Sequence, residues 1–223
     1  MIERSRTINL CFHGVGQPAR QLEPGEADYW VGVDTFRAVL DLVAGDPRVR
    51  LSFDDGNLSD VTVGLPALVE RGLTATFFVL AGRLDQVGSL ASDDVRTLAD
   101  AGMRIGSHGM DHVPWRGLDT GDVERELVQA RQRLEAVVGG RVVEAALPLG
   151  RYDRRLLGQL RRCGYRSLHT SDRRWARDGA WMQPRFSVRG ADTLSSLRRD
   201  VLTPAPLARR ARLGAIGVAK SLR

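Results

Sequence analysis

Short apolar stretches alternate with longer amphipathic ones along most of the chain, and this alternation predicts its secondary structure. Residues 7–12 and 74–80 are mainly apolar or β-branched, and the second stretch is apolar at nearly every position. Such a run is typical of a strand that is buried on both faces of a parallel sheet. Further strands are expected at 49–53, 103–106, 142–146, 167–170 and within 181–188.

The longer stretches repeat their apolar residues at helical spacing. The longest spans 119–138 and places Val123, Leu127 and Leu134 on one face. Asp34 and Ser92 are expected to cap two of the shorter helices, because their side chains can accept hydrogen bonds from first-turn N–H groups. The shorter helices are expected at 34–43, 63–71, 93–101, 153–163 and 193–202.

The order of these elements predicts the fold class. Strand and helix alternate throughout, which under the right-handed crossover rule implies an α/β protein with a parallel sheet and outer helices. The sheet could be open or closed into a barrel. A length of 223 residues suits one domain, or at most two small ones. We expect the domain to span residues 1–203.

Residues 204–223 are expected to form a basic C-terminal tail, since prolines interrupt the pattern at Pro204 and Pro206. The tail is weakly amphipathic and could lie on an anionic membrane surface as a peripheral contact. The alternative is a solvated or packed terminal helix. Gly214 and Gly217 favour the alternative, because glycines weaken an isolated helix.

The formal net charge is +6, and of the 33 basic residues all but Lys220 are arginine. The arginines are spread among 27 acidic residues and form no nucleic-acid-binding motif, so no nucleic-acid partner is expected. Two cysteines, Cys11 and Cys163, cannot make a disulfide framework and are expected to be buried thiols.

Residues 3–6 are polar, and the apolar run that follows is too short for a signal peptide. No stretch has the apolar length of a membrane span. These features predict a cytoplasmic protein, with membrane association through the tail as the alternative.

Candidate chemistry begins where the strand at 49–53 ends, in Asp54-Asp55-Gly56. Consecutive side chains on an extended chain point in different directions, so one carboxylate can bind a metal while the other addresses a water. Asp-Gly is also ordinary turn chemistry. The pair gains weight from His108 and His112, which a loop can bring onto one metal together with a carboxylate. Mixed ligands of this kind suit Zn²⁺, and Co²⁺, Ni²⁺ or Mn²⁺ would also fit.

Two motifs resemble those of a known family. Phe53-Asp54-Asp55-Gly56 and His108-Gly109-Met110-Asp111-His112 resemble the first two motifs of the polysaccharide deacetylases of the NodB-homology class, carbohydrate esterase family 4. The resemblance covers roughly residues 7–202. It implies a distorted (β/α)7-type barrel and removal of N-acetyl groups from an amino sugar. It also implies Asp54 as general base and Asp55, His108 and His112 as metal ligands.

The chain departs from the family pattern in two places. Ala146 stands where the third motif usually has an arginine, and no Leu-x-His that could supply the general acid follows His112, since His169 comes too early. A circularly permuted subgroup lacks that arginine and carries its acid histidine on the first strand. The stretch 10–14 resembles this displaced motif, which implies His13 as the general acid. A turn histidine bonded to backbone is the alternative for His13.

Three further hypotheses complete the site. The loop of Leu147, Pro148, Leu149 and Gly150 is expected to hold the tetrahedral oxyanion with a backbone N–H. Arg185 could orient Asp54 in place of the missing arginine, the alternative being a surface arginine. The irregular segment 17–32 is long enough to wall a cleft.

The expected partner is an N-acetylated glycan. One rival is a deformylase or amidase acting on a lipid-linked or nucleotide sugar, and another is a catalytically silent member that only binds glycan.

Overall fold

Seven parallel strands close into a barrel in the computed structural model, which describes residues 6–222. The first and last strands of the barrel, β1 and β10, pair in parallel and close it. This arrangement confirms the (β/α)7-type barrel and decides between the open and closed sheets. The barrel strands are β1 (Arg6–Phe12), β4 (Val49–Asp55), β5 (Ala75–Val79), β6 (Arg104–Ser107), β7 (Glu144–Ala146), β8 (Ser167–Thr170) and β10 (Met182–Ser187).

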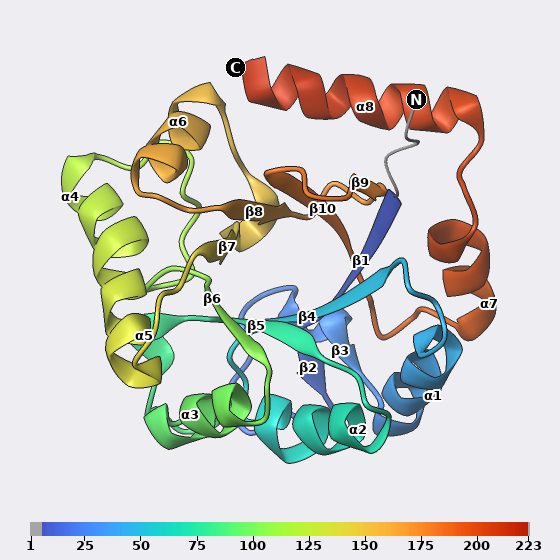
Figure 1. Cartoon of the computed structure of the whole chain (residues 1–223), viewed down its shortest axis with the longest axis horizontal. Helices are drawn as coiled ribbons and strands as arrows, with labels where there is room; N and C mark the ends of the chain where they lie inside the picture. The colour runs from blue at the N-terminus through green and yellow to red at the C-terminus, as the bar shows by residue number, and fades with distance from the viewer. Residues whose placement is uncertain (1–5, 223) are drawn as a thin grey trace.

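The helices surround the barrel as an outer ring (Figure 1). Three of the expected helices contain a π-helical segment: η2 (Asp60–Gly64) precedes α2, η4 (Glu124–Gln129) joins α4 to α5, and η6 (Arg198–Leu202) follows α7. The helices are α1 (Val33–Val43), α2 (Leu65–Glu70), α3 (Ser92–Asp100), α4 (Thr120–Val123), α5 (Ala130–Val138), α6 (Arg154–Arg162), α7 (Leu194–Leu197) and α8 (Leu207–Leu222).

Several short elements were not expected from the sequence pattern. Two-residue strands β2 (Gly14–Val15) and β3 (Trp30–Val31) pair with each other, and β9 (Ala176–Arg177) pairs antiparallel with β1. Single 3₁₀ turns lie in the loops near the carboxyl ends of the strands. They are η1 (Glu26–Tyr29), η3 (Ala81–Arg83) and η5 (Pro148–Gly150).

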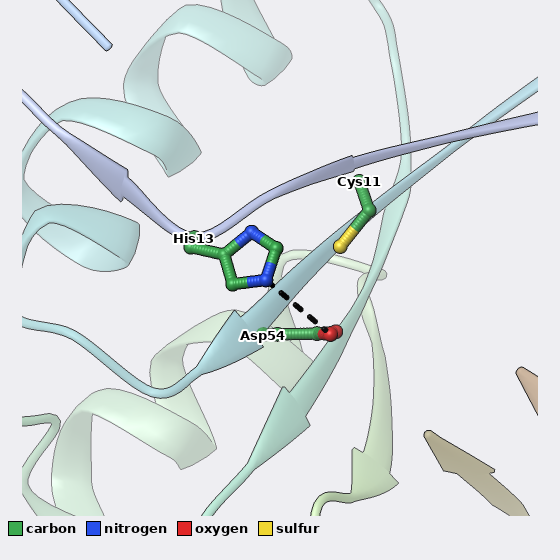
Figure 2. Close-up of side chains that lie close together, drawn as sticks. All are labelled: Cys11, His13 and Asp54. Carbon is green, nitrogen blue, oxygen red and sulfur yellow. Dashed lines mark ion pairs between the residues drawn. The ribbon is translucent and has the colours of Figure 1, made fainter. Parts of the chain in front are cut away.

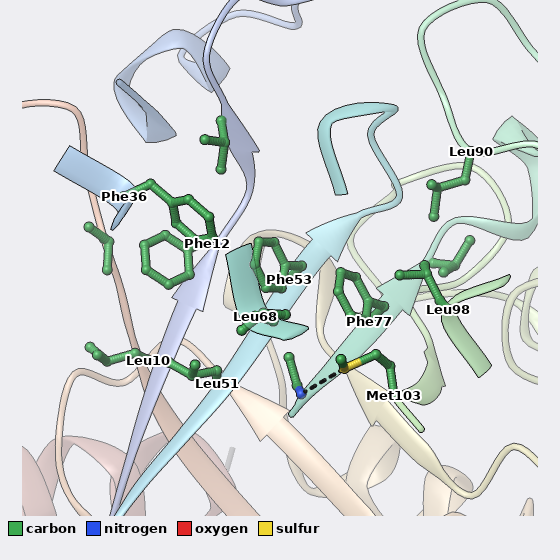
Figure 3. Packing of buried hydrophobic residues seen from close by; sticks show 14 of the residues in the cluster. Leu10, Phe12, Phe36, Leu51, Phe53, Leu68, Phe77, Leu90, Leu98 and Met103 are labelled. Atoms are coloured by element: carbon green, nitrogen blue, oxygen red, sulfur yellow. Dashed lines mark hydrogen bonds between the residues drawn. The ribbon is translucent and has the colours of Figure 1, made fainter. Parts of the chain in front are cut away.

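The barrel strands alternate between an apolar outer face and a polar inner face. Phe12, Phe53 and Phe77 point outward and pack with Phe36 of α1 and Leu68 of α2 (Figure 3). The rings of Phe53 and Phe77 stack with centroids 4.7 Å apart. Because side chains alternate along a strand, burying these rings turns the residues on either side of each into the barrel.

Both expected helix caps were wrong. The N-cap of α1 is Gly32, so Asp34 lies inside the first turn, where its charge can still favour the helix dipole. The N-cap of α3 is Ala91, whose N–H donates to the Asp94 carboxylate, while the Ser92 hydroxyl donates to Asp85. In each case the helix begins at or before the residue that was expected to cap it.

The C-terminal tail is helical as expected. Helix α8 packs against α6, and Lys220 Nζ lies 2.7 Å from the Asp172 carboxylate. The packed helix therefore agrees with the alternative that the two glycines favoured, while a domain boundary at residue 203 stays a prediction. Among residues 6–222, no helix combines the length and apolar character that crossing a membrane requires.

Candidate metal centre

The carboxyl ends of the barrel strands bring the candidate site residues together. His13 follows β1, Asp54 and Asp55 end β4, His108 follows β6 and Arg185 lies on β10. They line one cavity of about 490 Å³. This is the face on which barrel proteins place their chemistry. His112, Leu147, Leu149 and Gly150 line it too, whereas Pro148 is not among the lining residues.

Asp55, His108 and His112 converge on one point. Asp55 Oδ1 lies 3.4 Å from His108 Nε2 and 3.5 Å from His112 Nε2. The three ligand atoms all lie within 4.8 Å of one another. Asp55 Oδ1 is buried and accepts no hydrogen bond. A buried oxygen without a donor is costly unless a cation compensates it.

The other ring nitrogen of each histidine is held by a neighbouring oxygen. His108 Nδ1 donates to the Ala146 carbonyl at 3.0 Å, and His112 Nδ1 lies 2.7 Å from Glu23 Oε2. A nitrogen that donates to oxygen leaves its partner nitrogen with a free lone pair, here Nε2 on both rings. Two imidazole nitrogens and a carboxylate oxygen therefore face one point, and this donor set fits a divalent cation.

Backbone strain accompanies these ligands. Asp55 has a φ of 77° and His112 a φ of 58°, both in the left-handed region that residues other than glycine rarely adopt. Glycines flank the same turns, with Gly56 at 70° and Gly109 at 89°. Strain of this kind persists only where the surrounding structure holds it.

Glu126 supports the histidine loop, residues 108–112, through hydrogen bonds to its backbone. Its buried carboxylate accepts hydrogen bonds from the N–H groups of Met110 and Asp111, at 2.8 and 3.1 Å. The Trp115 indole N–H donates to the same carboxylate at 3.1 Å. Since these donors would otherwise be unsatisfied next to the ligands, Glu126 fixes the direction in which the histidine loop leaves β6.

Asp54 is bound to Arg185 rather than to the three ligands. Arg185 is buried and donates two hydrogen bonds of 2.6 Å to the two Asp54 oxygens. Burial would raise the pKa of Asp54, but the charges of Arg185 and His108 outweigh it and lower that pKa to about 2. Asp54 is therefore an ionised carboxylate at neutral pH.

His13 lies on the other side of Asp54, with its Nε2 4.0 Å from Asp54 Oδ2. Its ring packs against Tyr29 with centroids 4.8 Å apart, and its carbonyl accepts a hydrogen bond from Asn57. Burial lowers the pKa of His13, although the charges of Asp55 and Asp54 oppose this effect.

A second cluster, made of Cys11, His13 and Asp54, also has the residue types of a metal site (Figure 2). It fits a cation poorly. Burial raises the pKa of the Cys11 thiol, so it keeps its proton, and both Asp54 oxygens are engaged by Arg185. Cys11 is a buried thiol, as expected, while Cys163 is half-buried.

Sequence reasoning missed three residues that support the site: Glu23, Glu126 and Asn57. Glu23 lies in the irregular segment 17–32, which does wall the cavity. Neither its contact with His112 nor that of Glu126 with Met110 has a sequence signal, because both depend on how loops cross in space. Asn57 directly follows Asp54-Asp55-Gly56 and could have been considered from its position alone.

The fold and this donor set define a (β/α)-barrel protein with a candidate divalent-metal centre at the carboxyl ends of its strands. Residues 42–168 match the family model described as polysaccharide deacetylase, and the chain belongs to that family. The match includes Asp54, Asp55, His108 and His112, whereas His13 and Arg185 lie outside it.

Two curated relatives show limited sequence similarity. YxkH of Bacillus subtilis (strain 168) is 25% identical over 117 residues, which are 52% of this chain and 42% of that protein. A chitooligosaccharide deacetylase of Rhizobium leguminosarum bv. trifolii is 29% identical over 137 residues, which are 60% of this chain and 62% of that protein. The chain thus spans less than two thirds of either relative.

A solved structure shares the fold over nearly the whole chain. The Streptococcus pyogenes deacetylase PplD superposes with a TM-score of 0.76 at 19% identity, covering 89% of this chain and 99% of that chain. Similarity at this level of identity concerns the arrangement of the strands and helices.

Proposed function

We propose that the protein removes N-acetyl groups from amino-sugar residues of a polysaccharide or glycan precursor, in a reaction that depends on a divalent metal. One observation carries the proposal: the donor set of Asp55, His108 and His112 lies in the same cavity as an ionised Asp54 and as His13. Family membership supports the same chemistry.

The metal would be held by Asp55, His108 and His112, with zinc the best fit to two imidazoles and one carboxylate. When bound, it supplies Lewis acidity to a water and to the acetamide carbonyl oxygen.

Asp54 is the proposed general base. Arg185 holds its carboxylate rigidly, and the ionised form can accept a proton from an attacking water. Asp54 Oδ2 also lies 3.9 Å from His108 Nε2, so a water hydrogen-bonded to this oxygen would lie beside the ligand set.

His13 is the proposed general acid. An amine is a poor leaving group unless its nitrogen is protonated as the C–N bond breaks. His13 Nε2 faces the cavity beside Asp54 and would donate that proton to the amine nitrogen. Burial lowers the pKa of His13, and the nearby carboxylates of Asp55 and Asp54 oppose that effect without reversing it.

Leu149 is the proposed source of the oxyanion-binding N–H in the loop 147–150. The Leu147 N–H donates to the His169 carbonyl, the Gly150 N–H is directed at the Leu147 carbonyl, and proline has no N–H. By elimination the Leu149 N–H remains. Leu149 lies in the turn with a φ of 54°, and it is 58% exposed beside the cavity.

Amine and acetate release from N-acetylglucosamine oligomers, measured with and without added zinc, tests the proposal. N-formylated and lipid-linked sugars run in parallel separate a deacetylase from a deformylase or amidase. Asp54→Asn is expected to abolish turnover while metal content stays near that of the wild type, and His13→Ala is expected to lower turnover by about 100-fold or more. Full activity in His13→Ala would overturn its role. A wild-type protein that binds no metal and releases no amine would leave only glycan binding.

A further inference from the structure

A second cavity, of about 420 Å³, lies between α8 and the outside of the barrel. It shares no lining residue with the cavity of the candidate metal centre. Trp175 and Phe186 line it from the barrel side, and Leu213 and Gly214 line it from α8. Its volume is within the range of small-molecule sites. The space is therefore large enough for a ligand with an apolar part.

Four arginines line the same cavity: Arg6, Arg173, Arg174 and Arg177. Within residues 6–222 none of the four forms an ion pair, and Asp200 is the one carboxylate among the described lining residues. This gathering of charge stands out, because most other acidic and basic residues of the chain are interspersed.

The arrangement of these arginines is unfavourable without an anion. Arg6 and Arg177 stand directly opposite each other where β1 pairs with β9, so their side chains lie on the same face. Like charges at such positions destabilise a sheet. In addition, Arg174 Nε is buried and has no hydrogen-bond partner. Arg173 donates a hydrogen bond to the Ser187 carbonyl and lies over the Phe186 ring, so its charge is held at the cavity without a carboxylate partner among residues 6–222.

We propose that this cavity binds a phosphate ester that carries an apolar substituent. Guanidinium groups match the oxygen geometry of phosphate, and several of them together suit a multiply charged oxyanion better than a single carboxylate. The apolar substituent would lie against Trp175 and Phe186. Since α8 forms one wall, the ligand would hold α8 against the barrel. The phosphate can come from a membrane phospholipid or from a soluble ester.

Ligand-induced stabilisation of the whole chain tests the proposal, with dihexanoylphosphatidic acid as the soluble probe and sodium sulfate at equal ionic strength as the control. A ligand that binds only the folded protein raises the midpoint temperature of the protein's thermal unfolding. We expect dihexanoylphosphatidic acid to raise it in a saturable manner and sulfate to raise it far less. Equal effects of dihexanoylphosphatidic acid and sulfate would show general ionic binding and overturn the proposal.

Flotation with vesicles distinguishes the two sources of phosphate. Binding to phosphatidylcholine vesicles only when they contain phosphatidylglycerol, together with the soluble-probe effect, assigns the site to membrane lipid. Binding of the soluble probe without flotation assigns it to a soluble ester. Retention by an acidic peptide, with no effect of either phosphate probe, would assign the surface to a protein partner and overturn the proposal.

Arg177→Gln is the decisive variant. It removes one member of an opposed like-charge pair, so without ligand the protein should be at least as stable as the wild type. Its affinity for dihexanoylphosphatidic acid should fall about tenfold or more, as expected for loss of a charged contact to phosphate. Arg141→Gln, which changes an exposed arginine outside the cavity, is the matched control and should bind as the wild type does. Wild-type affinity in both Arg177→Gln and Arg6→Gln would refute the assignment. These tests are independent of deacetylase activity.

Discussion

Arg185 of β10 and Asp54 of β4 meet inside the barrel through two parallel hydrogen bonds of 2.6 Å, although 131 residues separate them in the chain. The same guanidinium also donates to Ser52 Oγ at 3.1 Å. Paired hydrogen bonds fix both the position and the charge of the carboxylate. A residue that lies outside the family-model match therefore sets the state of the proposed base.

Replacing Arg185 by lysine tests this relationship. Lysine keeps the positive charge but cannot make two parallel hydrogen bonds to one carboxylate. We expect turnover to fall by about 100-fold, within the range that a positioned base contributes, while metal content stays unchanged. Wild-type turnover in Arg185→Lys would show that the charge alone suffices. Arg185→Ala is a poorer probe, because an unpaired buried carboxylate costs about 3–5 kcal/mol of stability.

Metal content distinguishes the two candidate clusters. We expect Cys11→Ser to bind one metal per chain as the wild type does, because Cys11 belongs to the cluster whose carboxylate is already engaged by Arg185. His108→Ala and Asp55→Ala should each lose it. Elemental analysis after removal with a chelator and reloading with zinc provides the measurement. A metal-free Cys11→Ser protein would show instead that the cluster of Cys11, His13 and Asp54 holds the cation.

Glu23 should determine how tightly the metal is held. Its carboxylate contacts His112 Nδ1 at 2.7 Å and is itself paired with Arg83. Partners of this kind orient a ligand ring, and their loss typically costs about 10–100-fold in metal affinity. Glu23→Gln should therefore bind zinc more weakly in a competition titration with a chromogenic chelator. Glu70→Gln, which changes an exposed carboxylate outside the candidate metal centre, should bind zinc as the wild type does. Equal affinities in the two variants would exclude the proposed effect of Glu23.

Asp172 should make the fold sensitive to acid. Burial alone would raise the pKa of Asp172, but hydrogen bonds from Lys220, Tyr152 and Thr170 lower it below its usual value. The stability that the ionised Asp172 carboxylate contributes is therefore complete above the pKa of about 4 that an aspartate has in the unfolded chain. It is lost as the pH falls through the lower folded-state pKa.

Asp172→Asn and Lys220→Met should each lower the free energy of unfolding at pH 7 by about 1–3 kcal/mol, since each breaks hydrogen bonds to a charged group. The deficit relative to the wild type should shrink towards pH 3. Urea unfolding at both pH values provides the measurement, with Asp93→Asn, an exposed carboxylate, as the control. A deficit of the same size at both pH values would contradict the assignment to the ionised carboxylate.

The parallel strands with outer helices, and the meeting of the candidate site residues at the strand ends, could be predicted from sequence because they depend on local pattern. Closure into a barrel was implied by the family resemblance alone. Alternating strand residues direct Phe53 outward and Asp54 inward, and a strand end carries His13 to the same face of the barrel. These relationships need only the period of a strand and the rule that parallel strands share an end.

The remaining features depend on contacts between distant segments. Nothing near Glu23 indicates that it reaches His112, which is 89 residues away. The burial of Arg185 also followed from barrel closure, since only the pairing of β1 with β10 brings it over Asp54. The caps expected at Asp34 and Ser92 were wrong because both helices begin earlier than those caps require, α1 at Val33 and α3 at Ser92.

Closure by the last barrel strand has a consequence for biosynthesis. Domains fold as the chain leaves the ribosome from its N-terminus, and β1 emerges long before its partner β10. Until β10 is made, β1 and β8 each present an unpaired edge, which favours pairing with other chains. Asp54 meanwhile lacks its counter-charge, because Arg185 lies on β10. We therefore expect the incomplete chain to be prone to self-association until β10 pairs with β1, and the same pairing brings Arg185 to Asp54.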